Sequence, residues 1–142
     1  MIKALPFFCT LAVLLLLSKS LYGQTEKVIY ETFEVTDTVE VIHIDIAGKV
    51  TFEPWPADRV MAETSIMLEG APPRILDFFI EQGRYALLTQ GSEELALYSK
   101  DKVRRPVKYK ENDCFEQVSV RVFVPVGFEL SSDQTRLVRK SQ

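Results

Sequence analysis

Apolar and polar residues alternate over residues 38–68, and this alternation predicts successive β-strands. In the first, Ile42, Ile44 and Ile46 share one face, while polar residues such as His43 occupy the other. β-branched residues at every second position are typical of a strand with one buried face. The rest of the chain is expected to complete or cover the sheet that begins here.

A turn with Gly48 follows, and glycine permits a left-handed backbone there. Val50 and Phe52 then continue the alternation. A two-residue loop would place Ile46 opposite Thr51, whereas a three-residue loop places Ile46 opposite Val50. Because a slip of one residue turns every side chain to the other face, we expect a hairpin with a three-residue loop.

A further strand is expected over residues 59–68. Pro54 and Pro56 bracket Trp55 just before it, and proline lacks the backbone donor that a central strand needs. One face of the expected strand carries Val60, Ala62, Thr64, Ile66 and Leu68. Its second face, which includes Met61 and Met67, is only half polar, so we expect part of it to be covered.

The later segments predict a mainly β domain with one short helix. Strands are expected at 28–35, 84–89, 94–99, 115–124 and 128–130, with residues 84–99 forming a hairpin. A helix is expected at about 73–82, because proline suits its first turn and Gly83 suits its C-terminal cap. We therefore expect an antiparallel β-sandwich or rolled sheet of about seven or eight strands, with the helix packed on it. The domain is expected to span residues 24–131, and the polar segment 132–142 to be frayed.

The first 23 residues have the pattern of a secretory signal peptide. Lys3 precedes an apolar run over residues 4–17, and Gly23 supplies a small residue before the expected cleavage. The alternative is a membrane anchor, but this run is shorter than the roughly 20 residues that a membrane-spanning helix needs. The sequence thus predicts export across the inner membrane, to the periplasm, the outer membrane or the exterior. No transmembrane segment is expected after cleavage.

Charge and cysteine content limit the classes of function that are expected for this chain. The 142 residues carry a formal net charge of −3, which argues against a nucleic-acid partner. Cys114 is the one cysteine after the expected cleavage, so no internal disulfide is predicted. We interpret it as a small, partly buried apolar residue. A reactive thiol or an intermolecular bridge is the alternative.

Residues capable of catalysis are few. His43 is the only histidine, and Asp45 lies on the same strand face. No G-x-S-x-G nucleophile motif accompanies them, and nothing in the sequence places Cys114 beside His43. We also find no zinc ligand set, calcium loop or phosphate-binding loop, so neither a metal nor a cofactor is expected. The sequence predicts a protein that is not an enzyme; a small hydrolase using His43 or Cys114 is the less favoured alternative.

Two features could form a binding surface. The first is a basic stretch, residues 98–110, whose candidate residues are Tyr98, Lys100, Lys102, Arg104, Arg105, Lys108 and Tyr109. It could meet acidic polysaccharide, anionic lipid or an acidic protein; alternatively, its lysines only protect an edge strand. The second is Trp55, which could stack on a sugar or dock a partner; alternatively, it caps the end of the core.

Short motifs suggest a family. The run G-K-V-T-F-E-P-W contains Gly48, Val50, Phe52 and Trp55, and the run R-V-F-V-P-V-G-F-E-L covers residues 121–130. With the signal peptide, these runs resemble uncharacterised secreted proteins of Bacteroidetes-type bacteria that are related to putative-adhesin β proteins. The resemblance implies a β-domain without catalytic residues. We therefore expect a non-enzymatic envelope or secreted domain that binds a protein or an acidic glycan, or else a purely structural accessory domain.

Overall fold

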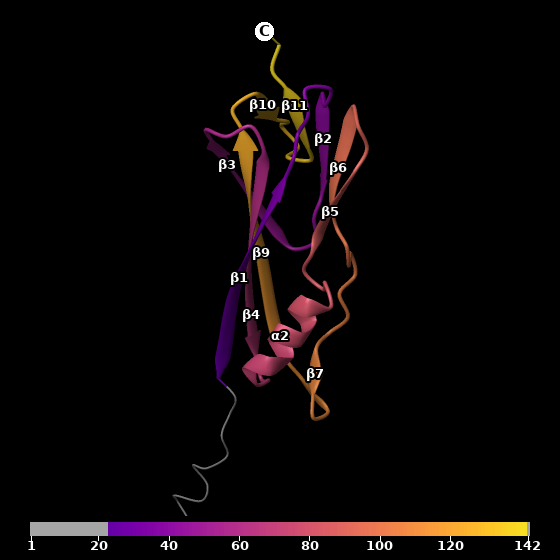
Figure 1. Ribbon diagram of the computed structural model, residues 1–142. Helices are drawn as coiled ribbons and strands as arrows, with labels where there is room; N and C mark the ends of the chain where they lie inside the picture. Colours follow the sequence, from indigo (N-terminus) through magenta and orange to yellow (C-terminus); the bar gives the residue numbers. More distant parts are fainter. Residues whose placement is uncertain (1–22, 142) are drawn as a thin grey trace, which may run out of the picture.

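Residues 23–141 are described by a computed structural model of the chain (Figure 1). The predicted signal peptide falls, up to residue 22, outside the described residues. Within the described part of the chain, no helix is long and apolar enough to cross a membrane.

The strands form two sheets and a small separate hairpin. The first sheet has the order β1–β4–β9–β3, with bounds Gln24–Phe33, Val60–Glu69, Phe115–Pro125 and Lys49–Trp55. The second has the order β10–β11–β2–β6–β5, with bounds Phe128–Leu130, Arg136–Arg139, Val41–Asp45, Glu94–Ser99 and Leu87–Gln90. The hairpin pairs β7 (Lys108–Tyr109) with β8 (Asn112–Asp113). The helix α2 spans Pro73–Glu81.

The expectation of a mainly β fold with one short helix is confirmed, and the described strands form no closed barrel. The expectation that all pairs are antiparallel is wrong. β2 pairs with β6 in parallel, and β3 pairs with β9 in parallel. These parallel pairs arise because the chain repeatedly crosses between the two sheets. The strands of the two sheets also outnumber the expected seven or eight.

The hairpin predicted between the strands on either side of Gly48 does not form. β2 lies in the five-stranded sheet and β3 in the four-stranded sheet, so the turn at Gly48 carries the chain across the sandwich. Gly48 has φ of +102°, and a Cβ there would lie 3.0 Å from the carbonyl oxygen of Val118. The turn predicted at Gly48 is therefore present and requires glycine, but it connects the two sheets and not the two strands of a hairpin.

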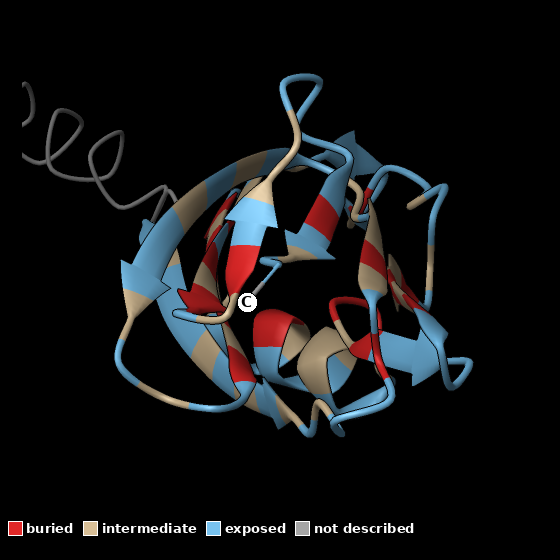
Figure 2. Cartoon of the chain, turned by 90° about the horizontal axis from the view of Figure 1, so that it is seen from above, coloured by how far each residue is buried: buried red, intermediate tan, exposed pale blue. Residues whose placement is uncertain are grey.

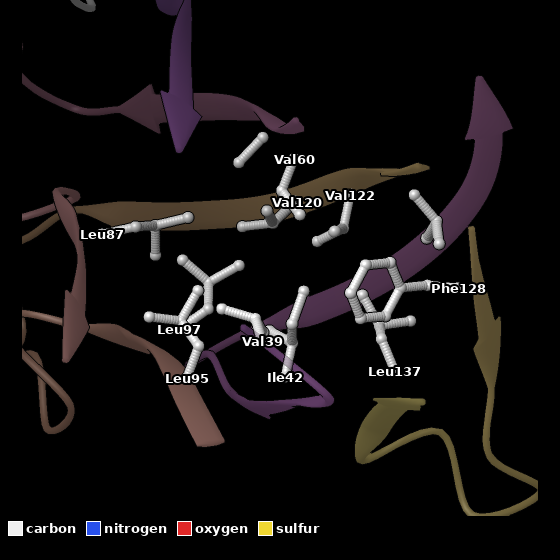
Figure 3. Packing of buried hydrophobic residues seen from close by; sticks show 12 residues of the cluster. Val39, Ile42, Val60, Leu87, Leu95, Leu97, Val120, Val122, Phe128 and Leu137 are labelled. Carbon is white, nitrogen blue, oxygen red and sulfur yellow. The ribbon is translucent and has the colours of Figure 1, made fainter. Parts of the chain in front are cut away.

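Side chains from both sheets meet in an upper core cluster (Figure 3). Ile42 of β2, Val122 of β9 and Leu137 of β11 are fully buried there. Each large apolar side chain buried in this way contributes about 1.5–3 kcal/mol. Seen from above in Figure 2, buried positions face the space between the layers and exposed positions lie around the outside.

The helix α2 covers the lower part of the four-stranded sheet and forms a second cluster with it (Figure 1). Leu76 is fully buried there against Ile66 and Leu68 of β4. Phe79 is partly buried in the same cluster, whereas Phe78 is 53% exposed. The five buried residues predicted for β4, at every second position from Val60 to Leu68, are confirmed.

The C-terminal segment is ordered, and the expectation of a frayed tail is wrong. β11 pairs with β10 on one side and with β2 on the other. Leu137 is fully buried, and Arg139 donates to the carbonyl oxygen of Val39 at 2.8 Å. A single apolar residue in a polar segment can anchor a strand when it completes an existing core.

β3 can accommodate Pro54 because it is an edge strand. It is the last strand in the order of its sheet, and its partner is β9. A proline on an edge strand need not donate a hydrogen bond to a neighbour.

Candidate functional site

The basic stretch leaves the five-stranded sheet at β6 and runs past α2 to the β7–β8 hairpin (Figure 1). Its cations therefore follow an extended path and do not gather into one patch. The expected short edge strand is β7, which pairs with β8 and not with either large sheet. The candidate residues thus divide into two groups, one beside α2 and one on the hairpin.

The group beside α2 lines the first candidate site, a surface hollow of about 550 Å³. Tyr98, Lys100 and Lys102 line it from the end of β6 and the segment that follows, and Phe79 and Arg84 line it from α2 and the segment after the helix. Hollows of this volume are within the range that accommodates small ligands. The combination of an aromatic face with ammonium groups is suited to a sugar that carries a carboxylate.

The two lysines at the hollow differ in their surroundings. Lys102 pairs with Asp45, and its ammonium lies 5.6 Å from the centre of the Tyr98 ring. Lys100 has no carboxylate within ion-pair distance among the described residues. A Cβ built on Gly83 would come 2.9 Å from its Nζ, so the ammonium lies against the end of α2. A positive charge is favourable there because carbonyl groups at a helix C-terminus carry partial negative charge.

Arg84, at the hollow, belongs to a buried polar cluster that the sequence analysis did not predict. The guanidinium of Arg84 donates to both carboxylate oxygens of Glu116, at 2.8 and 3.0 Å. It also donates to the carbonyl oxygen of Arg105 at 2.6 Å, and the hydroxyl of Tyr85 donates to Glu116 at 2.5 Å. No local pattern could reveal these contacts, because Arg84 and Glu116 are 32 positions apart.

The cluster fixes the protonation of its members. Burial raises the pKa of Glu116, but hydrogen bonds from Arg84 and Tyr85 lower it further, so its pKa lies below the usual 4.5. Burial and the hydrogen bond to Glu116 raise the pKa of Tyr85 far above 10.0. Arg84 and Glu116 are therefore a charged pair, and this pair connects the segment after α2 to β9.

Lys108 and Arg104 of the stretch contact groups outside the hollow. Lys108 pairs with Asp113 at 3.9 Å on the hairpin. The guanidinium of Arg104 is half-buried, lies 5.8 Å from the centre of the Tyr85 ring and donates to the carbonyl oxygen of Ala47 at 3.4 Å. The ring of Tyr109 lies beneath the guanidinium of Arg74, which is 5.8 Å from its centre. Through these contacts, this part of the basic stretch connects segments that are distant in the sequence.

Trp55 lies apart from the basic stretch, at the end of β3. Its indole N–H donates to the carbonyl oxygen of Arg59 at 2.8 Å, and its ring lies 5.7 Å from that of Phe123. Phe123 also lies under the guanidinium of Arg121, at 4.9 Å. These side chains belong to the outer face of the four-stranded sheet, which turns away from the core. Trp55 therefore closes the turn between β3 and β4 and does not cap the upper core.

His43 and Cys114, the two residues of the less favoured hydrolase hypothesis, lie in different parts of the structure. His43 lies on β2 with its Nε2 3.9 Å from a carboxylate oxygen of Glu94. Cys114 precedes β9 and packs against the lower cluster. It is partly buried, as expected. Burial and the nearby carboxylates of Asp113 and Glu116 raise the pKa of its thiol, and a protonated thiol is a weak nucleophile.

Among residues 23–141, no group of three or more His, Cys, Asp or Glu side chains is arranged to hold a metal ion. No protein family, no curated protein and no solved structure matches the chain. The resemblance to adhesin-related proteins therefore stays a prediction.

Proposed function

We propose that this chain is an exported, non-catalytic binding domain, and that the hollow beside α2 takes an acidic sugar of an envelope glycan. The observation that carries the proposal is the meeting of Tyr98, Lys100 and Lys102 around one hollow of about 550 Å³. An aromatic ring can stack on a sugar, while the ammonium of Lys100 is available for its carboxylate. Export rests on the pattern of residues 1–23.

The test uses a defined probe, a short oligomer of galacturonic acid, titrated calorimetrically into the purified protein. Binding should weaken as salt is added, because an exposed ion pair is screened. Lys100→Glu should reduce affinity by about tenfold or more, since it replaces attraction by repulsion. Lys110→Glu is the matched control, because this exposed lysine lies after β7 and should leave affinity unchanged.

Two outcomes would count against the glycan proposal. One is an equal loss of affinity in both variants, which would indicate a general charge effect. The other is no binding of the acidic oligomer by the wild-type protein. The second outcome would leave the basic stretch as a solvated, structural segment, in line with the ion pairs of Lys102 and Lys108.

A second candidate function is docking of a protein on the outer face of the four-stranded sheet. This face was expected to be partly covered, yet no described segment covers it. Tyr30 is 62% exposed there and Phe115 59% exposed. Ser65 and Ser119 are opposite one another at a shallow hollow of about 300 Å³ on the same sheet. Small side chains at the hollow would leave room for a large side chain of a partner.

The test for this second function is site-specific photo-crosslinking in cells. A photoreactive amino acid at Phe115 should yield a discrete crosslinked protein. The same amino acid at Leu88, which is 40% exposed on β5 of the other sheet, should not. Identical products from both positions would indicate non-specific encounters and would exclude this function for the outer face.

A further inference from the structure

The four outermost strands of the two sheets differ in how well they resist pairing with another strand. β5 spans Leu87–Gln90 and β10 spans Phe128–Leu130, so both are short. β3 carries Pro54, which blocks a regular ladder. These are common ways in which an edge is protected.

β1 has none of these protections. It is 10 residues long, contains neither proline nor glycine, and pairs only with β4 in the described part of the chain. Two neighbouring apolar side chains of β1 are exposed, Val28 at 50% and Tyr30 at 62%. One complete edge of backbone donors and acceptors is therefore open to another strand.

We propose that β1 pairs antiparallel with β1 of a second copy of this chain, about a two-fold axis at Ile29. In this register Lys27 faces Glu31 of the second copy, twice by symmetry. Val28 likewise faces Tyr30 of the second copy, also twice. Each exposed apolar side chain thus meets an apolar side chain. The side chains of Lys27 and Glu31 are engaged within their own chain, where Lys27 pairs with Asp77 at 3.5 Å and Glu31 accepts from the backbone N–H of Leu87.

Charge disfavours three of the neighbouring registers, and apolar pairing disfavours the fourth, an axis at Val28, because it would set Tyr30 against Glu26. An axis at Lys27 would place two ammonium groups opposite each other, and an axis at Glu31 would place two carboxylates opposite each other. An axis at Tyr30 would set Glu26 against Glu34. Like charges directly opposite one another in a ladder are destabilising, whereas the axis at Ile29 avoids every such pair. A single sheet would then continue through both copies.

A partner of another kind is disfavoured by the same observations. The exposed apolar positions of β1 are complementary to themselves, and the register brings no like charges together. A two-fold pairing uses the same patch on both copies, which is the commonest form of oligomer.

Cysteine crosslinking tests the register. Val28→Cys and Tyr30→Cys chains, both with Cys114→Ser, are purified, mixed and oxidised. The mixture should yield a disulfide-linked dimer, because residue 28 faces residue 30 across the pair. Val28→Cys alone should crosslink far less, because the two residues 28 are offset along the strands beyond ordinary disulfide reach. Equal crosslinking in both samples would overturn the register.

Sedimentation equilibrium tests the association itself. The wild-type protein should dimerise, and Val28→Glu should weaken the dimer by about tenfold because it sets a carboxylate against the ring of Tyr30, twice by symmetry. Lys49→Glu, on the opposite edge strand β3, should leave it unchanged. A wild-type protein that stays monomeric up to about 1 mM would overturn the proposal.

Discussion

The carboxylate of Glu31 lies in surroundings that disfavour its negative charge. One carboxylate oxygen accepts from the backbone N–H of Leu87 at 3.3 Å, while the other is buried without a hydrogen-bond partner among the described residues. The hydroxyl of Thr64, on the inner face of the adjacent strand β4, is also buried and unpartnered. Burial raises the pKa of Glu31 above 4.5, and the bond from Leu87 offsets this only in part.

Glu31→Gln should stabilise the protein at neutral pH by about 1 kcal/mol, because it removes a poorly solvated charge. The folded state favours the protonated form of Glu31. That contribution to stability is complete below the unfolded pKa of 4.5 and is lost as pH rises through the raised folded pKa. The gain from the substitution should therefore shrink as the pH falls through the raised folded pKa toward 4.5, and it should be absent below 4.5. Thermal unfolding at neutral and acid pH measures both effects.

The control for this substitution is Glu26→Gln, on the exposed side of the same strand. It should change the melting temperature little at either pH. A loss of stability in Glu31→Gln at neutral pH would mean that the carboxylate has a partner that stabilises its charge.

Glu116→Ala should have the opposite effect and destabilise the protein by about 3–5 kcal/mol at neutral pH. It leaves Arg84, whose side chain is 8% exposed, as an unpaired buried charge. The pKa of Glu116 is lowered, so its contribution is present above the unfolded pKa and is lost as pH falls through the folded pKa. The difference from wild type should therefore decrease in acid. Denaturant unfolding at several pH values tests this, and a pH-independent difference would contradict the assignment.

At the scale of elements, the C-terminal strand β11 is an interior strand of the second sheet. It lies between β10 and β2, and its residues Leu137 and Val138 point to opposite sides. Leu137 is fully buried in the upper cluster, whereas Val138 is 40% exposed.

Leu137→Ala should destabilise the protein by about 2–5 kcal/mol, the usual cost of truncating a buried leucine. The neighbouring Val138→Ala serves as the matched control and should cost well under half as much. Equilibrium unfolding in urea gives both values. Similar small changes in both variants would show that the tail is frayed in solution.

The crossover between β2 and β3 is the other element-scale feature. Gly48 turns the chain from one sheet into the other with a positive φ. Both strands place their apolar side chains in the same core, but from opposite layers. The parallel pairings of β2 with β6 and of β3 with β9 follow from this crossover.

At the scale of the whole molecule, two core clusters share the same long strands. β4 contributes Val60 and Ala62 to the upper cluster and Ile66 and Leu68 to the lower one. Because single strands span both clusters, the clusters should unfold together and not in separate steps.

Leu76→Ala tests this coupling. Leu76 is fully buried in the lower cluster, and Trp55, the only tryptophan, does not belong to that cluster. The substitution should lower the unfolding midpoint reported by tryptophan fluorescence by as much as the midpoint reported by circular dichroism. Val126→Ala, at a position 61% exposed, is the control and should shift neither. Separate midpoints for the two signals would show that the lower cluster unfolds independently.

Local patterns in the sequence determined the elements and the side chains that face the core. The alternation at β4, the helix between Pro73 and Gly83, and the hairpin of β5 and β6 were all predicted correctly. Each depends on periodicity or turn chemistry within a few residues, which a sequence displays directly. Residue type along the chain also singled out Tyr98, Lys100 and Lys102, which line one hollow, and their role in binding stays a prediction.

The tertiary structure alone decided which strands are neighbours and which charges meet. Alternation looks the same whether a strand packs beside its successor or across the sandwich from it, so the β2–β3 crossover could not be predicted. Polar residues carry no local signal for a distant partner, which is why the pair Arg84–Glu116 was missed. For the same reason, only the fold shows that Lys102 meets Asp45 and that Leu137 completes a core.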